Sequence, residues 1–305
     1  MDISSGSKAD IVSVADAEEQ IVPVVFDSPH SGTAFPSETP PAASNDALLR
    51  ASDLFVDALF GTAPLHGAAL LCAHFSRVFI DPNRPLTDID PAVIAGKWPG
   101  PVQMSARTAK GIGLVWRLAP DQSEIYAKPL SVAEVQHRIA TYWHRYHGEL
   151  LKLLELRRRR FGAVWHVNCH SMPGTGTRAM GDEGQRRADI IVGDLDGLSC
   201  SADFRACVVE CLRAKGLDVR VNELFKGAEI VKRYGDPASH SHSIQVEINR
   251  SLYMDEQTCT KRHDFDGFRK EVTAPLIEAV CAFAADEVRH RGDRGSGGGL
   301  ARRVG

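Results

Sequence analysis

Short apolar runs rich in β-branched residues alternate along the chain with longer segments in which apolar residues recur at the helical period. The pattern predicts helices at residues 45–60, 132–160, 202–215 and 265–288. It predicts strands at residues 21–26, 68–80, 161–168, 188–194, 217–222 and 242–249. This alternation is typical of an α/β protein in which helices cover both faces of a sheet.

The predicted elements lie between two polar ends. Residues 1–18 form a polar lead-in, and residues 289–305 are rich in glycine and arginine. Such compositions are typical of flexible or disordered segments. Because no internal repeat or linker interrupts the rest, the sequence predicts a single domain at residues 19–288.

Composition narrows the class of partner and the compartment. The 305 residues include 36 Lys and Arg against 39 Asp and Glu, so no basic excess is available to neutralise nucleic-acid phosphates. A small molecule is the expected partner. Seven cysteines without a regular spacing predict reduced thiols, and no stretch reaches the roughly 18 apolar residues of a membrane span. We therefore expect a cytoplasmic protein that binds neither membrane nor nucleic acid.

Four polar clusters follow apolar runs, the position at which open α/β sheets bind ligands. The first, DSPHSG at residues 27–32, contains His30. The second comprises Arg77 and residues 81–85, DPNRP, around a predicted strand VFI. Its arginines, Arg77 and Arg84, together with Asn83, could bind a carboxylate, or an internal Arg–Asp ion pair could simply fix the loop.

The third and fourth clusters each contain a reactive side chain. In NCHSMPG at residues 168–174, Cys169 and His170 are neighbours on a strand and point to opposite faces, so Cys169 is expected in the core rather than as a nucleophile. His166 lies deeper in the same strand and is expected to pack. In QVEINR at residues 245–250, Glu247 interrupts an apolar strand, which indicates either a general base or an ion-pair partner of an arginine.

Two histidines and a carboxylate form the usual hydrolytic zinc set. His30 and His170 supply the imidazoles, and the carboxylate is either Asp53 or Asp57, which are one turn apart on the predicted helix. The chain has no HExxH and no paired CxxC, so spacing rules alone do not predict zinc.

Taken together and in order, seven motifs resemble the N-formylglutamate amidohydrolase family over residues 22–285. They are DSPHSG, the SD of ASDLFVDALF, SRVFIDPNRP, NCHSMPG, ADIIVGDLDGLSC, FKGAEIVKRYG and HSIQVEINRSLYMDE. The resemblance implies a three-layer α/β/α sandwich with a mixed central sheet, similar to that of the zinc exopeptidases. It implies a cytoplasmic enzyme of histidine degradation that hydrolyses N-formyl-L-glutamate to formate and L-glutamate with one Zn²⁺ or another divalent ion per chain.

The resemblance also implies a role for each matching residue. His30, Asp53 and His170 are the expected zinc ligands, and Glu247 is the expected general base. The expected substrate contacts are Arg77, Asn83, Arg84 and Arg250, with Lys232 or Arg233 as further cations. The residues that could also line the pocket are Ser28, Ser31, Ser171 and His242. Two features depart from the family pattern: Pro82 between Asp81 and Asn83, and a second histidine at residues 240–242.

Three alternatives stay open at this point. The expected partner is a small acidic N-acyl amino acid, but the chain could be a deacylase of another N-acyl amino acid or a carboxypeptidase-like peptidase on the same scaffold. It could be a non-catalytic amino-acid-binding protein, or a thiol hydrolase that uses Cys169. The sequence makes no prediction of the oligomeric state.

Overall fold

A seven-stranded mixed sheet forms the centre of the computed structural model, which describes residues 10–36, 40–177 and 180–296. The strand order is β1-β3-β2-β6-β9-β7-β8. The bounds are β1 Val12–Ala15, β2 Val24–Ser28, β3 Ala69–Ala73, β6 Val164–Met172, β7 Ile190–Gly193, β8 Val219–Val221 and β9 Ser241–Asn249. The strands β3, β2, β6 and β9 run parallel, whereas β1 pairs antiparallel with β3 and β7 antiparallel with β9.

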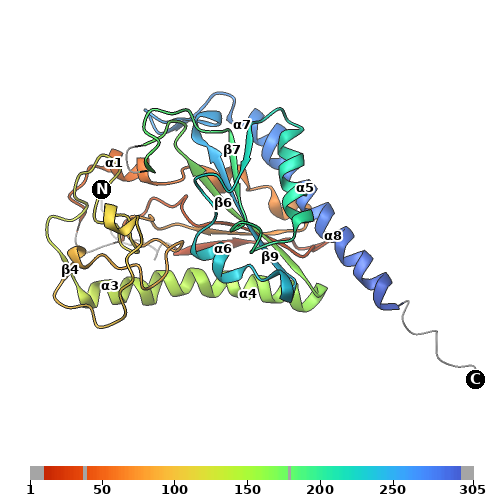
Figure 1. Cartoon of the computed structure of the whole chain (residues 1–305), viewed down its shortest axis with the longest axis horizontal. Helices are drawn as coiled ribbons and strands as arrows, with labels where there is room; N and C mark the ends of the chain where they lie inside the picture. Colours follow the sequence, from red (N-terminus) through yellow and green to blue (C-terminus); the bar gives the residue numbers. More distant parts are fainter. Residues whose placement is uncertain (1–9, 37–39, 178–179, 297–305) are drawn as a thin grey trace, which may run out of the picture.

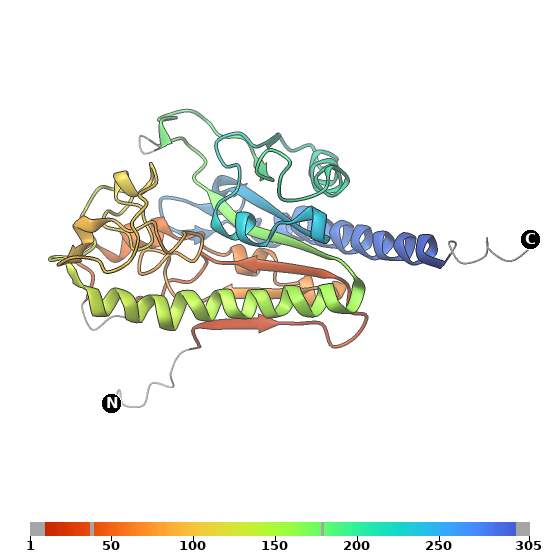
Figure 2. The ribbon, with the colours of Figure 1, turned by 60° about the horizontal axis from the view of Figure 1, so that its bottom comes forward.

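Helices cover both faces of this sheet (Figures 1 and 2). One face carries a continuous helix made of α3 Val132–Arg138, a π-helical turn at Ile139–Trp143, and α4 His144–Phe161. The other face carries α5 Ala202–Arg213 and a second long helix, made of α7 Phe265–Phe268, a π-helical turn at Arg269–Thr273, and α8 Ala274–Ser296. The predicted three-layer α/β/α arrangement with a mixed sheet is confirmed.

Shorter elements connect these layers. They are the helices α1 Asn45–Ala51, α2 Val56–Leu59 and α6 Glu229–Tyr234, the strand pairs β4 Ile94–Ala95 with β5 Leu130–Ser131 and β10 Met254–Asp255 with β11 Thr260–Lys261, and 3-10 turns at Ala63–His66, Pro91–Val93, Thr108–Lys110, Pro237–Ser239 and Arg250–Leu252.

The apolar side chains of each strand pack alternately into two hydrophobic cores, because successive side chains of a strand point to opposite faces of the sheet. On β2, Val24 and Phe26 pack with α5 and α8, whereas Val25 packs with α4. On β6 and β9 this alternation separates apolar from polar residues. Val167 of β6 and Val246 of β9 join the α5–α8 core. The polar residues that alternate with the apolar ones along these two strands face the α4 side. That polar face supports the candidate site.

Several predicted boundaries are wrong, and three of them affect the site. The predicted helix at 45–60 is two short helices, because the backbone is extended at Ser52, with ψ of 152°, and left-handed at Phe55, with φ of 66°. Strand β3 ends at Ala73, and VFI at residues 78–80 is turn and loop rather than strand. Strand β6 continues to Met172, so His170 lies inside a strand instead of after one.

The ends of the chain are more regular than predicted. Within the expected polar lead-in, Val12–Ala15 forms the edge strand β1 against β3. Helix α8 runs past the expected end at residue 288 to Ser296. The rest of the two predicted tails, residues 1–9 and 297–305, lies outside the described residues. Of the helices in the described part of the chain, none combines the length and hydropathy needed to cross a membrane.

Gly32 of the DSPHSG motif packs directly against the backbone that follows β3. A Cβ atom at this position would lie 2.3 Å from the carbonyl carbon of His74 and 2.6 Å from the carbonyl oxygen of Ala73. We therefore expect Gly32→Ala to lower the free energy of unfolding by about 1–3 kcal/mol, measured by urea denaturation. Gly148→Ala in α4 is the control, since nothing lies within 4 Å of its added Cβ. It should raise stability by about 0.5–1 kcal/mol, and equal effects of the two variants would refute this explanation.

Candidate active site

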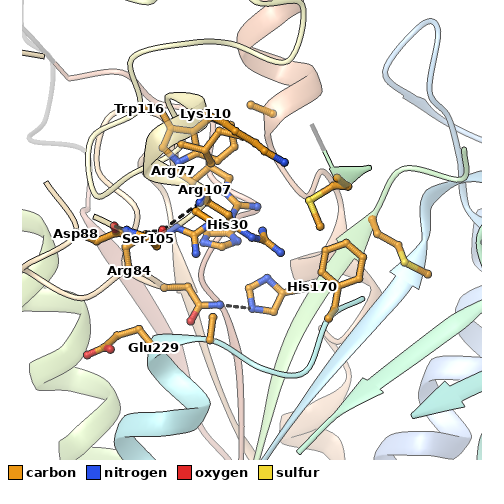
Figure 3. A pocket seen from close by; sticks show the side chains of 18 of the residues that line it. His30, Arg77, Arg84, Asp88, Ser105, Arg107, Lys110, Trp116, His170 and Glu229 are labelled. Carbon is orange, nitrogen blue, oxygen red and sulfur yellow. Dashed lines mark hydrogen bonds between the residues drawn. The ribbon is translucent and has the colours of Figure 1, made fainter. Parts of the chain in front are cut away.

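A cavity of about 1410 Å³ opens at the carboxyl ends of β2, β6 and β9 (Figure 3). Its floor contains His30 from the loop after β2, His170 from β6 and Glu247 from β9. Its walls come from the long loop between Asn83 and Gln122 and from residues 224–233. The predicted first, third and fourth polar clusters therefore meet at one place, as expected for an open α/β sheet.

His30, Asp53 and His170 form a compact buried trio. One ligand atom of each lies within 4.8 Å of the other two. Asp53 Oδ2 is 3.3 Å from His30 Nδ1 and 3.1 Å from His170 Nδ1. Zinc bonds of roughly 2.0–2.1 Å in tetrahedral geometry place two ligand atoms about 3.4 Å apart. The spacing of the trio therefore fits a zinc ion.

The loop around Asp53 is held by backbone and hydroxyl contacts. The Asp53 amide donates to the His30 carbonyl at 2.9 Å, and Ser31 Oγ donates to the Asp53 carbonyl at 3.1 Å. Ser31 Oγ also accepts from the Asp57 amide at 3.1 Å and lies 2.5 Å from Ser28 Oγ. Because helix α1 ends at Ala51 and α2 begins at Val56, Asp53 lies in the loop between them and does not share a helical face with Asp57. Asp53 is the carboxylate beside the histidines.

Hydrogen bonds at the outer nitrogens orient both imidazole rings. His30 Nε2 lies 2.7 Å from Asp81 Oδ1, and His170 Nε2 lies 2.7 Å from Asn168 Oδ1. The Asn168 amide nitrogen donates to Asp27 at 2.8 Å, which turns its oxygen towards His170. With protons on both Nε2 atoms, both Nδ1 lone pairs face the Asp53 carboxylate, an arrangement that a bound cation would stabilise.

Two further observations support a cation in the trio. His30 Nδ1 is buried and makes no hydrogen bond within the described residues. Burial alone would raise the pKa of Asp53, but Arg77, His170 and His30 outweigh it and hold that pKa well below the usual value. A carboxylate that stays ionised and imidazole nitrogens are donors that zinc prefers. The residues present therefore fit a zinc ion.

Glu247 is opposite His170 in the register of β6 and β9 and lines the same cavity. Gln245 Nε2 donates to its carboxylate at 2.9 Å. Burial raises the pKa of Glu247 above its usual value. The alternative role of Glu247, as an ion-pair partner of Arg77 or Arg250, is not supported, because both arginines pair with other carboxylates.

Arg77 and Arg250 use much of their hydrogen-bonding capacity inside the protein. Arg250 lies 2.9 Å from Asp53 and donates to Ser171 Oγ at 3.2 Å. Arg77 lies 3.0 Å from Asp81 and 3.4 Å from Asp53. The internal ion pair, which the sequence left as one of two readings for Arg77, is present. Both side chains nevertheless line the cavity and add positive charge beside the trio.

Asn83 and Arg84 also reach the cavity, on a turn that accommodates Pro82. The Asn83 amide nitrogen lies 3.1 Å from His170 Nε2, and its oxygen accepts from the Ile230 amide at 2.9 Å. Pro82 causes no break in this arrangement, since its carbonyl oxygen accepts from His147 Nε2 at 2.8 Å.

Of the four further pocket residues predicted, the cavity lining in the described structure includes Ser171. The prediction is wrong for the others. Ser28 and Ser31 are buried beneath the loop, and His242 faces the other side of the sheet, where it stacks on Trp165 with ring centroids 5.5 Å apart. Cys169 lies in the α5–α8 core as predicted, and burial raises the pKa of its thiol well above the usual value.

The sequence reasoning missed the basic residues that the long loop brings to the cavity, above all Arg107. Lys232 and Arg233, predicted as further cations, line the outer part, with Arg233 paired to Glu229. No motif marks Arg107, because its place depends on how a loop without regular structure folds back over the sheet.

A two-histidine, one-carboxylate group with an adjacent glutamate, at the carboxyl edge of an α/β sheet, is an arrangement of the kind that metal-dependent hydrolases use. The chain belongs to the N-formylglutamate amidohydrolase family, whose family model matches residues 22–254. It is therefore a hydrolase that acts on an amide, and the resemblance inferred from the seven motifs is confirmed.

Individual relatives agree with this assignment. The chain is 29% identical over 269 residues to an N-formylglutamate deformylase of Pseudomonas putida, covering 87% of this chain and 94% of that protein. It is 27% identical to an N-formylglutamate deformylase of Pseudomonas aeruginosa, over 87% of this chain and 95% of that protein. The crystal structure of N-formylglutamate amidohydrolase from Ralstonia eutropha JMP134 superposes with a TM-score of 0.86 at 38% identity, covering 90% of this chain and 99% of that chain.

Proposed function

We propose that the chain hydrolyses N-formyl-L-glutamate to formate and L-glutamate with a zinc ion held by His30, Asp53 and His170. The observation that carries this proposal is the convergence of two oriented Nδ1 atoms on one ionised carboxylate, with Glu247 in the same cavity. The family and the names of the two Pseudomonas relatives support N-formylglutamate as the substrate. A cytoplasmic location, a role in histidine degradation and a single catalytic domain at residues 19–288 belong to the same proposal.

In this mechanism the protein's own groups move the proton and balance the charge. When bound, zinc supplies polarisation of the formyl carbonyl and a lowered pKa for a nearby water. Glu247 accepts the proton of that water as its oxygen bonds to the formyl carbon. Glu247 then donates the proton to the departing amine nitrogen as the C–N bond breaks. Arg77 and Arg250 stabilise the negative charge that develops on the carbonyl oxygen.

Formate release from N-formyl-L-glutamate tests this function. Zinc-loaded protein should release formate and L-glutamate in equal amounts, and chelation should abolish the release. Acetylated amino acids and dipeptides, assayed side by side, test the deacylase and peptidase alternatives. Faster turnover of either class would replace the substrate assignment. Binding of N-formyl-L-glutamate by zinc-loaded protein without turnover would favour the amino-acid-binding alternative.

Asn168 tests the orientation of His170. We expect Asn168→Ala to weaken zinc binding by about 10–100-fold, because the His170 Nε2 proton loses its acceptor. The measurement is zinc competition with a chromophoric chelator. Asn222→Ala is a matched control, since Asn222 donates to Asp194 at 2.7 Å away from the cavity lining. Equal zinc affinity in both variants would contradict the role of Asn168.

A further inference from the structure

Arg84 is a buried cation without a hydrogen-bond partner for its side chain in the described structure. It is 7% exposed, and its Nε atom is both buried and unbonded. Its backbone is fixed, since its amide donates to the Asp81 carbonyl at 3.2 Å and its carbonyl accepts from Trp143 Nε1 at 3.0 Å. Since buried charges are normally paired, this guanidinium in the cavity wall is suited to pair with an anionic group of a ligand.

Arg107 is a second cation in the same cavity, and its loop is anchored to the protein (Figure 3). Asp88 Oδ1 accepts from the Ser105 amide at 2.8 Å, and Asp88 Oδ2 accepts from Ser105 Oγ at 3.0 Å. The Thr108 hydroxyl also donates to Asp88. These bonds hold the residues on both sides of Arg107. The guanidinium lies 5.5 Å from the centroid of the Phe225 ring, and no carboxylate within the described residues pairs with it.

The neighbouring acids do not neutralise the two arginines. Asp81 and Asp88 are near Arg84, but Asp81 bonds His30 and Arg77, and Asp88 bonds the Ser105–Thr108 turn. Burial, followed by the charges of Arg84 and Arg77, lowers the pKa of Arg107 to about 10. Holding like charges together in a cavity is unfavourable unless an anion occupies the space between them.

We propose that Arg84 and Arg107 together bind one carboxylate of the substrate and so select N-acyl derivatives of acidic amino acids. This inference rests on the proposed function and adds a specificity-determining residue on the long loop. Guanidinium groups match a carboxylate with directed, charge-assisted hydrogen bonds. Arg77 and Arg250 already bond Asp53, which leaves Arg84 and Arg107 as the cations of the inner cavity without an ion-pair partner in the described part of the chain.

The test compares N-formyl-L-glutamate with its two monoamides, N-formyl-L-glutamine and N-formyl-L-isoglutamine, on wild type and Arg107→Gln. Wild type should turn over one monoamide with a kcat/KM at least about 30-fold below that of the diacid, because the buried Arg84 and the half-buried Arg107 lose their anionic partner. Arg107→Gln should lose a similar factor on the diacid, mainly through KM, and little on that monoamide. If the poor substrate is N-formyl-L-glutamine, the two arginines bind the side-chain carboxylate. If it is N-formyl-L-isoglutamine, they bind the α-carboxylate. Arg84→Gln should behave in the same way, and Arg107→Lys should lie between.

Arg117→Gln is the matched control, because Arg117 belongs to the same loop but pairs with Asp90 at 2.9 Å and is not part of the cavity lining. It should leave the ratio between the three substrates unchanged. The proposal is overturned if Arg107→Gln lowers all three substrates by one factor or changes none of them.

Binding of glutarate, measured by calorimetry, separates this inference from the proposed function. If wild type releases no formate from any of the three compounds, the proposed function fails. Weaker glutarate binding by Arg107→Gln than by wild type would still support the carboxylate site. Equal binding by the two proteins would overturn it.

Discussion

Glu247→Gln should lower kcat for formate release by about 10²–10⁴-fold while zinc stays bound. The amide keeps the size of the side chain and can still contact Gln245, but it cannot accept the proton of the attacking water. Because Glu247 is not in the buried trio, the zinc content should remain that of wild type. The measurement combines steady-state formate release with metal analysis of the same preparation.

Glu210→Gln, on the exposed side of α5, is the matched control for this change and should keep full activity. A Glu247→Gln variant with wild-type kcat would remove the general base from the mechanism. A variant that loses zinc together with activity would instead place Glu247 among the groups that hold the metal.

His170→Ala should abolish both zinc binding and turnover. It removes one of three ligand atoms and leaves Asn168 and Asp53 facing an empty space. The loss of zinc affinity should exceed the roughly 100-fold upper range for residues that only orient a ligand, and so exceed that of Asn168→Ala. Equilibrium dialysis against buffered zinc gives the affinity, and circular dichroism shows whether the variant is folded.

The exposed His263→Ala is the control, and its zinc content should equal that of wild type. Retention of one zinc per chain by folded His170→Ala would show that the metal lies elsewhere. It would also leave the orientation of the two imidazoles without explanation.

The layered α/β fold could be predicted from the sequence because strand and helix periods alternate clearly. The boundaries at the site could not, since they depend on tertiary contacts. His170 lies inside β6, where polar residues of one face are satisfied by Asp27 and Asn83 rather than by solvent. Without those partners, a polar residue at the end of an apolar run is indistinguishable from the start of a loop.

The choice between Asp53 and Asp57 shows the same limit of local reasoning. Helical spacing placed both on one face, but the helix ends at Ala51, and left-handed backbone at Phe55 separates the loop of Asp53 from the next helix. A phenylalanine gives no local signal for such a break, because left-handed backbone is rare in residues other than glycine and asparagine.

Motif order identified the trio and Glu247, which spacing alone did not. Arg107 lay outside every motif, and its position depends on the bonds from Ser105 and Thr108 to Asp88 across a long loop. Contacts of this kind are formed between segments without periodicity. They are visible in the structure but cannot be predicted from the hydrophobic periodicity of the sequence.

The central claim is that zinc in the His30–Asp53–His170 trio supports hydrolysis of N-formyl-L-glutamate. Its most direct test is a titration of metal-depleted protein with zinc, with formate release as the readout. Activity should rise linearly and stop rising at one zinc per chain. Full activity in the metal-depleted protein, or one tightly bound zinc without formate release, would contradict it.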